Sequence, residues 1–463
     1  MSQDNGFSAV FRPQYRARAL VVAGGIVIHA INVFIVITVL PSIVQEIGGL
    51  PYFAWNTTLY VLASVLAGGF AARILPAIGA RAHYRGALAL FALGSAICAL
   101  APSMPVLLIG RLIQGLGAGS LSALSWTMVR ALFPEPLWPT AISVISASWG
   151  IATTLGPAFG GLFAGPGVWR WAFWTVAAIA PVLWVLVETA LPRDLAPAPR
   201  PTRPMAHLNL ALLCLSVLGV SFGSAGTGVG RNALGLAIAL AGLGGFVWLE
   251  AHGRRRLMPA GACNPTTGLG ITFAAMMAVV IAVNTEIFVP YFLQTLHGLA
   301  PVHAGYLSAL MSFGWTAGSM AVSGAPPHIT PRWMTAGPIV QAAALAGLAL
   351  LTPTAFMTGQ TGLLGLCLFA QGVGIGICWP HVCAGVYRFA PDSEQDLAAA
   401  SITMVIMLSN ALGSALAGMV SNLAGLAEGG PDGARLAAFW LFASFIAAPL
   451  AAFVAVRRIL ALR

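Results

Sequence analysis

The sequence predicts an all-α membrane protein that crosses the bilayer fourteen times, as two similar six-helix bundles with two extra helices inserted between them. Of its 463 residues, 59% are hydrophobic and only 7% are charged, whereas a soluble domain carries about 25% charged residues. Apolar runs of about 20 residues recur along the chain, and each is long enough to cross roughly 30 Å of hydrocarbon. The composition therefore excludes a soluble enzyme, and an internal repeat predicts the two bundles.

The fourteen predicted spans follow one another with short connections. They cover residues 19–40, 52–75, 84–103, 105–132, 138–165, 168–191, 206–227, 231–251, 270–293, 302–324, 334–352, 360–387, 397–425 and 434–457. The first run is too long for a signal-peptide core and is interpreted as a retained span. We expect an N-terminal six-helix bundle over residues 1–192, a linker with two extra spans over 193–260, and a C-terminal six-helix bundle over 261–463.

The formal net charge of +10 comes from Arg, because the chain has no Lys. All but four of its 22 Arg fall on one predicted side of the membrane; Arg170, Arg231 and Arg435 fall on the other, and Arg111 lies within a span. Since cytoplasmic loops are enriched in basic residues, we expect a multi-pass protein of the inner (cytoplasmic) membrane with both termini cytoplasmic. The charge thus indicates topology rather than a nucleic-acid partner, and the six Cys, mostly within apolar runs, form no disulfide framework.

An internal repeat relates the two predicted bundles. The paired motifs are Leu40-Pro41 with Val289-Pro290 at an offset of 249, Ala67-Gly68-Gly69 with Ala317-Gly318-Ser319 at 250, Gln114–Gly119 with Gln371–Gly376 at 257, and Leu155-Gly156 with Leu412-Gly413 at 257. A nearly constant offset over four pairs is hard to obtain by chance. It predicts two bundles of the same orientation, and parallel repeats of this kind place a substrate site near the bilayer midplane, between the halves.

The fifth span carries the most distinctive stretch, Gly150-Ile-Ala-Thr-Thr-Leu-Gly156-Pro157-Ala-Phe-Gly160-Gly161. Gly and Pro are tolerated in a membrane helix because neighbouring helices and hydroxyl groups re-satisfy the freed backbone groups. Gly150, Thr153, Pro157 and Gly161 recur at helical spacing, which predicts one smooth face with a bend at Pro157. Such a face lets another helix approach closely and move against it, although an ordinary small-residue packing seam has the same pattern.

The chain resembles the major facilitator superfamily, specifically its fourteen-span drug:proton antiporter branch, over nearly its whole length. The stretch Gly150–Gly161 is similar to that family's antiporter signature, Arg111-Leu-Ile-Gln114-Gly115-Leu-Gly117 to its fourth-span signature, and Leu40-Pro41-Ser-Ile43 to the end of its first-span signature. The resemblance implies alternating access and, commonly, efflux of hydrophobic or cationic drugs driven by inward proton flow. We expect small molecules, protons and the lipid bilayer as partners, no cofactor, and a monomer.

Arg111 is the most informative single residue. A guanidinium in the middle of a membrane helix is costly in lipid, so it should face the bundle interior or a wet cavity and find partners. Gln114 lies three residues later, on the same helix face. The family resemblance associates the matching Arg with proton coupling and cavity structure; the alternative is a structural clamp bonded to backbone carbonyls.

Glu286, which follows Asn284 and Thr285 in the ninth span, is the one acid placed well inside a span, whereas Glu188 and Glu250 lie at span ends that water can reach. Burial of a carboxyl group disfavours its ionised form, so that it can take up and release a proton near neutral pH. Glu286 is therefore the leading proton carrier, or the counter-charge of a cationic substrate. The alternative is a hydrated Glu near the outer mouth, because Pro290 is expected to end the helix one turn later.

Two positions depart from the family pattern. In the first span, Asn32 stands where the family usually has a membrane-embedded Asp, and an amide cannot carry a proton. His29, one turn away, can titrate in its place, although a lone His on an apolar helix is commonly a hydrogen-bonded packing residue. After the second span, Gly79 and Arg81 fit the family's gating motif, but Pro76 occupies the place of its acid. The salt bridge that this motif normally makes is therefore expected to be missing or replaced.

Metal and nucleotide chemistry receive little support. Cys378, His381 and Cys383 lie close together in the twelfth span, but Cys383 points away from the other two and no fourth ligand is evident. We therefore expect no metal. No Walker-type phosphate loop is present in the sequence, so ATP is not the expected energy source.

The leading hypothesis is a proton-coupled secondary transporter that exports a hydrophobic or cationic small molecule, with protonation of Glu286 competing with substrate binding. The alternative is an anion or metabolite transporter with Arg111 as substrate anchor and different or no proton coupling, which the missing acid at Asn32 motivates. A third hypothesis is a scaffold or sensor that kept the fold without transporting, and its support is the altered motif after the second span.

Overall fold

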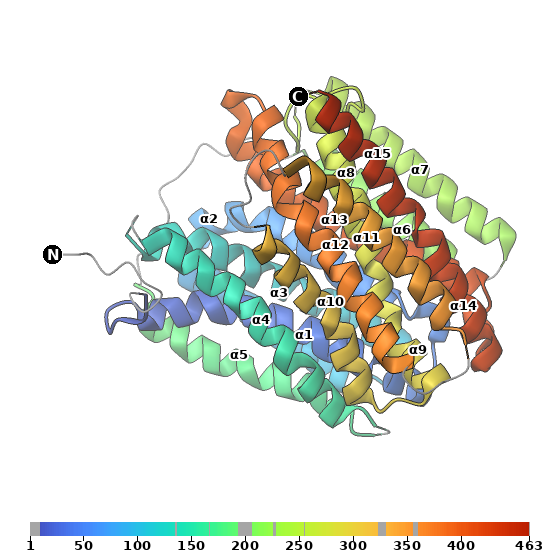
Figure 1. Cartoon of the computed structure of the whole chain (residues 1–463). Helices are drawn as coiled ribbons and strands as arrows, with labels where there is room; N and C mark the ends of the chain where they lie inside the picture. The colour runs from blue at the N-terminus through green and yellow to red at the C-terminus, as the bar shows by residue number, and fades with distance from the viewer. Residues whose placement is uncertain are drawn as a thin grey trace. The chain divides into compact units, whose positions relative to one another are not determined.

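The computed structural model describes residues 10–134, 137–165, 167–192, 206–225, 228–253, 255–322, 330–354 and 360–462. The described chain is helical with short 3-10 turns and contains no strand (Figure 1). Ten of its helical segments are long and apolar enough to cross a membrane. The described residues therefore form an all-helical fold of about fourteen helices, as the sequence predicts.

Five long helices follow one another in the N-terminal part. They are α1 (Arg16–Ile47), α2 (Trp55–Ala99), α3 (Met104–Leu132), α4 (Trp138–Phe163) and α5 (Arg170–Ala190). α2 contains both the second and the third predicted span, because two helical segments meet at Gly79, whose φ of 78° is not helical. Only Gly adopts a positive φ without steric cost, so this position allows the chain to redirect between the two spans.

The C-terminal part begins with two helices that precede the second repeat. Its helices are α6 (His207–Ser224), α7 (Val229–His252), α8 (Gly268–Val283), α9 (Val289–His297), α10 (Pro301–Ala321), α11 (Thr330–Leu351), α12 (Gln360–Phe389), α13 (Gln395–Leu423), α14 (Gly430–Phe445) and α15 (Ala447–Ala461). Pro in the first turn starts α3, α4, α9, α10 and α14, since a first-turn residue needs no N–H partner.

One predicted span differs from the structure in a way that affects the site. The run at residues 270–293 is not one continuous α-helix, because residues 284–288 form a 3-10 turn between α8 and α9. Pro290 was expected to end a helix but instead lies in the first turn of α9, which continues to His297. The expectation that Pro290 ends the helix is therefore wrong, and the break in this span comes before that residue.

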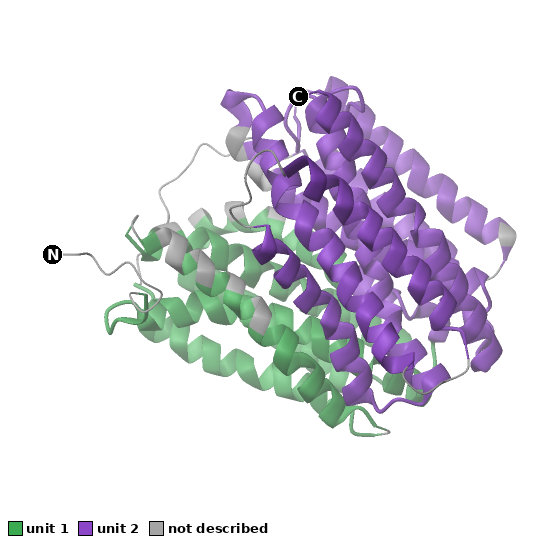
Figure 2. Ribbon diagram, viewed as in Figure 1, with its two compact units in different colours: residues 1–49, 59–203 green, residues 50–58, 204–463 purple. Residues whose placement is uncertain are grey.

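The chain divides into two compact units (Figure 2). Unit 1 comprises residues 1–49 and 59–203, and unit 2 comprises residues 50–58 and 204–463. α6 and α7 pack against each other, and α6 also contacts α13, so both extra helices belong to unit 2. The separate linker domain over residues 193–260 stays a prediction.

The segment 50–58, between α1 and most of α2, is bonded within unit 2. The buried amide of Asn422, at the end of α13, donates to the carbonyl oxygens of Pro51 (2.7 Å) and Ser224 (2.6 Å). The Thr58 hydroxyl lies 2.7 Å from that of Ser414, and the Phe53 ring stacks on Phe288 with centroids 5.0 Å apart. These bonds explain why nine residues that connect two helices of unit 1 cluster with unit 2.

Glycines on α3 let it pack closely against α2 within unit 1. A Cβ atom added to Gly115 would collide with the Tyr60 carbonyl oxygen, and one added to Gly119 would collide with that of Ser64. Gly117 faces the other segment of α2, where an added Cβ would lie 2.6 Å from the Ala87 carbonyl oxygen. α3 is therefore held between both segments of α2 by residues that leave no room for a side chain.

The same contacts recur within unit 2. Gly372 and Gly376 of α12 meet the carbonyl oxygens of Met311 and Trp315 on α10. Each glycine lies 257 residues after its counterpart on α3, as the sequence predicts. Each partner lies 251 residues after its counterpart on α2, one more than the offset of 250 read from the sequence for these two helices. Gly374, 257 residues after Gly117, packs on α11 in the matching way. The repeat predicted from the sequence is therefore present in the helix packing of the two units.

Candidate functional site

A buried polar cluster in unit 1 joins α1, α2 and α3. Gln114 is at its centre: its amide nitrogen donates to the Asn32 carbonyl oxygen (3.1 Å) and to the Ser95 hydroxyl (2.7 Å). Its carbonyl oxygen accepts from Nη1 of Arg111 and from the Asn32 amide. Arg111 is 2% exposed, and Asn32, Gln114 and Ser95 are fully buried. Helical spacing places Arg111 and Gln114 on one face of α3, and the fold brings Asn32 of α1 to that face.

An aromatic side chain links His29 to Arg111. The Tyr60 hydroxyl lies 2.9 Å from Nδ1 of His29, and the two rings stack with centroids 5.5 Å apart. The Arg111 guanidinium carbon lies 4.0 Å from the centre of the Tyr60 ring. A cation over an aromatic face is stabilised by the ring quadrupole, and more so in a dehydrated interior. The structure thus joins His29, Asn32, Arg111 and Gln114, all four predicted from the sequence, and adds Tyr60 and Ser95.

Tyr60 and Ser95 were missed because no local pattern marks them. Both lie on α2, in spans that precede Arg111, and their role depends on how the helices pack.

A second polar group surrounds the helix break in unit 2. The amide of Gln371 donates to the Ala282 carbonyl oxygen (2.9 Å) and the Thr285 hydroxyl (3.2 Å), and Gln341 donates to the Val279 carbonyl oxygen (3.0 Å). Asn284 donates to Asn410 on α13 (3.2 Å). Backbone groups freed inside a membrane helix need such partners. Side chains from α12, α11 and α13 therefore surround a 3-10 stretch inside a predicted span.

Glu286 lies within this 3-10 turn. Its side chain is half-buried, while Asn284, Thr285, Ile287 and Phe288 around it are buried. Among the described residues, none makes a hydrogen bond or ion pair with the Glu286 carboxyl group. Glu286 and Asn284 are thus close in the chain but differ in environment, because the amide is bonded to α13 and the carboxyl group is left available.

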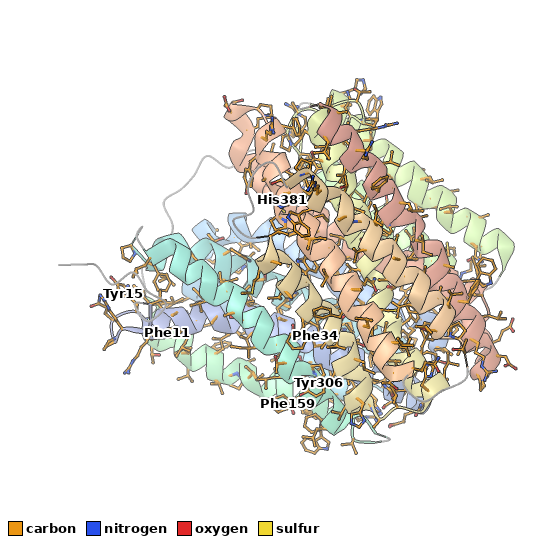
Figure 3. All side chains as sticks on the ribbon, in the orientation of Figure 1. Phe11, Tyr15, Phe34, Phe159, Tyr306 and His381 are labelled. Carbon is orange, nitrogen blue, oxygen red and sulfur yellow. The ribbon has the colours of Figure 1, made fainter. Side chains whose placement is uncertain are left out.

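The motif of α4 forms a close contact with α1. An added Cβ on Gly160 would lie 2.7 Å from the Thr38 Cβ, and Gly156 leaves no room for a side chain against Phe34 (labelled in Figure 3). The tight face is therefore Gly156 and Gly160, one residue off the predicted series, although Pro157 and Thr153 are also buried. Gly150 and Gly161 lie in the helix, but the surroundings of Gly150 fall outside the described residues.

The motif after the second span, where Pro76 stands in place of the family's acid, is bonded to an acid of another helix, α5. Arg81 forms an ion pair with Glu188 near the end of α5 (3.3 Å) and donates through Nε to the Leu191 carbonyl oxygen (2.6 Å). Arg85 forms a second ion pair with the same carboxylate (3.3 Å). The side chain of Pro76 lies outside the described residues. Arg81 therefore pairs with an acid of α5 within unit 1, and the expectation that the family's own salt bridge is missing or replaced stays a prediction.

Two further acids have structural partners. Glu46, at the end of α1, accepts from the Gly167 N–H (2.6 Å) and the Trp169 indole (2.8 Å) and pairs with Arg170. Since Glu188 is bonded near the other end of α5, that helix is tied by ion pairs at both ends. Glu250 was expected at a hydrated span end; it is 6% exposed, so that expectation is wrong. Its carboxylate is buried because it accepts from three donors.

The Cys-rich stretch of α12 has no metal-binding geometry in the described part of the chain. No group of three His, Cys, Asp or Glu side chains is arranged there to hold an ion. Cys378 is buried with its thiol directed at the Ile375 carbonyl oxygen (3.4 Å), while His381, labelled in Figure 3, is half-buried on the same helix. Buried thiols of this kind act as small apolar side chains.

Comparison with known proteins gives a family match and close relatives. Residues 22–358 match the model of the Major Facilitator Superfamily. A probable multidrug-efflux transporter of Mycobacterium tuberculosis is 34% identical over 445 residues, which cover 94% of this chain and 93% of the relative. The multidrug transporter protein MdtP of Bacillus subtilis is 25% identical over 421 residues, 88% of this chain and 75% of the relative.

Solved structures agree in fold. A bacterial homologue of the human lysosomal transporter Spinster, in an inward-facing and unoccupied conformation, superposes with a TM-score of 0.71 at 14% identity, over 98% of this chain and 99% of that one. A D-xylose–proton symporter superposes with a TM-score of 0.63 at 15% identity, over 95% and 97% of the two chains.

Proposed function

This chain belongs to the major facilitator superfamily, and from that membership we propose that it exports hydrophobic or cationic small molecules by alternating access, in exchange for protons. Membership makes it a membrane-embedded transporter of small molecules rather than an enzyme. The names of its relatives, a probable multidrug-efflux transporter and a multidrug transporter protein, support the multidrug-type substrate range.

The proposal includes the finer architecture. We place the chain in the fourteen-span drug:proton antiporter branch, as a monomer in the cytoplasmic membrane with both termini in the cytoplasm. The asymmetry of the Arg residues supports this orientation. The two extra helices α6 and α7, which precede the second repeat, support the fourteen-span count.

The observation that carries the proposal is the break between α8 and α9. Transporters of this general kind bind substrate and coupling ion where a membrane helix departs from regular α-helical geometry, and Glu286 lies in the 3-10 turn between α8 and α9 with no described bonding partner. Ionisable groups inside membrane spans mark proton relays and substrate pathways, and a carboxyl group without a fixed partner is open to either a proton or a cation. Glu286 therefore serves as the group at which proton and cationic substrate compete.

In unit 1, the hydrogen-bonded cluster around Arg111 controls how α1 moves against α3. Arg111 fixes Gln114, and Gln114 fixes Asn32 of α1, so a shift of α1 against α3 requires these bonds to rearrange. His29 is bonded to Tyr60 at the edge of the same cluster. The tight contact of Gly156 and Gly160 with α1, beside Pro157, gives α4 a surface on which α1 moves.

The alternative is an anion or metabolite transporter with Arg111 as substrate anchor and different or no proton coupling. It is less favoured because Arg111 is 2% exposed, with its guanidinium on the Gln114 carbonyl oxygen and the Tyr60 ring. A substrate anion would have to displace both contacts.

Glu286→Gln tests the coupling in everted vesicles loaded with a fluorescent lipophilic cation such as ethidium. We expect exchange of external for internal cation to persist in the variant, and accumulation driven by an imposed pH gradient to disappear. Glu428→Gln, at an exposed Glu of the same unit, is the matched control and should behave as the wild type. Proton-driven accumulation that survives in Glu286→Gln removes Glu286 from the mechanism, and uptake of organic anions but not cations favours the alternative.

A further inference from the structure

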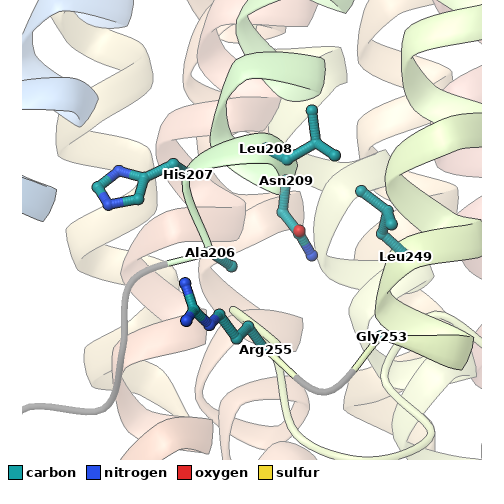
Figure 4. A pocket seen from close by; sticks show the side chains of 7 residues that line it. All are labelled: Ala206, His207, Leu208, Asn209, Leu249, Gly253 and Arg255. Atoms are coloured by element: carbon teal, nitrogen blue, oxygen red, sulfur yellow. The ribbon is translucent and has the colours of Figure 1, made fainter.

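A surface pocket of about 450 Å³ opens where the start of α6 lies beside the end of α7. Figure 4 shows Arg255 reaching from the loop after α7 toward the start of α6, with Asn209 and Leu249 on the other side of the pocket. None of the transport residues proposed above lines it. The pocket therefore needs an explanation of its own.

The buried carboxylate of Glu250 holds together the elements that form the pocket. It accepts from the backbone N–H groups of Leu257 (2.9 Å) and Met258 (3.0 Å) and from the amide of Asn209 on α6. The two backbone bonds hold the loop after α7 against the end of that helix, the Asn209 bond joins α6 to it, and the negative charge has three donors around it. The loop residue Arg255 is consequently held at the pocket while Glu250 is already occupied.

Among the described residues of this loop, Arg255 is the available cation. Its neighbour Arg256 pairs with Glu394 (3.4 Å). Arg255 is exposed, and no described residue makes an ion pair or hydrogen bond with it. The start of α6 adds to the positive potential, because its N-cap residue, Ala206, offers no side-chain hydrogen bond to the first turn. An anion in the pocket would meet a guanidinium that forms two parallel hydrogen bonds with phosphate.

The flank of the pocket is apolar and continues along both helices. Leu208 on α6 is 60% exposed and Trp248 on α7 is 61% exposed. Further exposed apolar side chains follow on the same helices, including Leu215, Phe222, Leu236 and Leu240. Both helices are candidate membrane spans. The pocket thus lies at the end of two spans, where a charged group at the membrane surface is followed by surface suited to acyl chains.

We propose that this pocket binds the headgroup of an anionic phospholipid such as phosphatidylglycerol, with its phosphate on Arg255 and its acyl chains along α6 and α7. Basic pockets between membrane helices on the cytoplasmic side are suited to such headgroups, and the neighbouring Arg254–Arg256 run assigns this end to that side. A free phosphate ion would use Arg255 equally well but would gain nothing from the exposed apolar side chains. The exposed apolar side chains therefore favour the phospholipid over a free phosphate ion.

Native mass spectrometry of the purified full-length protein tests the proposal. The wild type, Arg255→Gln, Arg255→Lys and Arg332→Gln are titrated with phosphatidylglycerol and, separately, with phosphatidylcholine. Loss of a hydrogen-bonded charge is expected to weaken phosphatidylglycerol binding about tenfold in Arg255→Gln, with partial recovery in Arg255→Lys. Arg332 is an exposed Arg outside the pocket, so Arg332→Gln should bind as the wild type does.

Three outcomes overturn the proposal. The first is equal retention of phosphatidylglycerol by the wild type and Arg255→Gln, and the second is no preference of the wild type for phosphatidylglycerol over phosphatidylcholine. The third is competition by inorganic phosphate at concentrations as low as those of the lipid, which would make the pocket a site for the free anion. None of these outcomes depends on whether the protein transports, so the test is separate from that of Glu286.

Discussion

Gln114 and Gln371 occupy matching positions of the repeat, but of the two only Gln114 makes a described hydrogen bond to a buried charge. Replacing each by Leu compares how much each glutamine contributes to the stability of the fold. Gln114 makes four described hydrogen bonds, one of them from the Arg111 guanidinium. Gln371 makes two, to the Ala282 carbonyl oxygen and the Thr285 hydroxyl, and its own carbonyl oxygen is buried without a hydrogen-bond partner. Leu has a similar volume, so neither change opens a large cavity.

The hydrogen bonds of each glutamine determine how much free energy of unfolding each variant should lose. A hydrogen bond to a charged group contributes about 1.5–3 kcal/mol and a neutral one about 1 kcal/mol, so one charged and three neutral bonds give a loss of about 4.5–6 kcal/mol for Gln114→Leu. The two neutral bonds of Gln371 amount to about 2 kcal/mol, and removing its unpaired buried oxygen offsets part of that loss. Polar pairs in membrane proteins average only about 0.6 kcal/mol, so the order of the two losses is the firmer prediction.

Reversible unfolding of the purified variants in mixed micelles, titrated with sodium dodecyl sulfate, measures both free energies of unfolding. Gln114→Leu should lose at least about twice as much stability as Gln371→Leu. Equal losses, or a larger loss for Gln371→Leu, would refute the claim that Gln114 holds the Arg111 charge in the interior of unit 1.

Three further experiments test other contacts. Gly117→Ala places a Cβ 2.6 Å from the Ala87 carbonyl oxygen and should destabilise by about 1–3 kcal/mol, whereas Gly86→Ala, a helical glycine with open space around it, should stabilise by up to about 1 kcal/mol; the same titration measures both. A double-mutant cycle of Arg81→Gln and Glu188→Gln should give a coupling of at most about 1 kcal/mol, because both side chains are partly exposed; a coupling several times larger would contradict this. Asn422→Ala should lose about 2 kcal/mol, with faster proteolysis of the 50–58 segment, because its amide holds two backbone carbonyl oxygens.

Much of the helix packing could be predicted because it depends on residues that recur at short spacing in the sequence. The glycines at Gln114–Gly119 and Gln371–Gly376 recur at helical spacing, and a helix that carries Gly on one face must approach its neighbour through that face. Arg111 and Gln114 were likewise placed together by spacing alone. The repeat then related the two units without any long-range information.

The remaining parts of the site depend on contacts that local patterns do not encode. The acid that pairs with Arg81 comes from Glu188, 107 residues later, and no motif links the two. The break at Asn284–Phe288 forms because Gln341 and Gln371 bond carbonyl oxygens of α8, whereas apolar length alone predicted a continuous helix. Glu250 was misplaced because its three donors come from another helix and from the folded loop.

Accumulation of a lipophilic cation by purified wild-type protein in liposomes, with and without an imposed pH gradient, measures proton-coupled export itself. We expect uphill accumulation toward the acidic compartment that stops when a protonophore collapses the gradient. Cation flux that is the same with and without the gradient would contradict proton-coupled export.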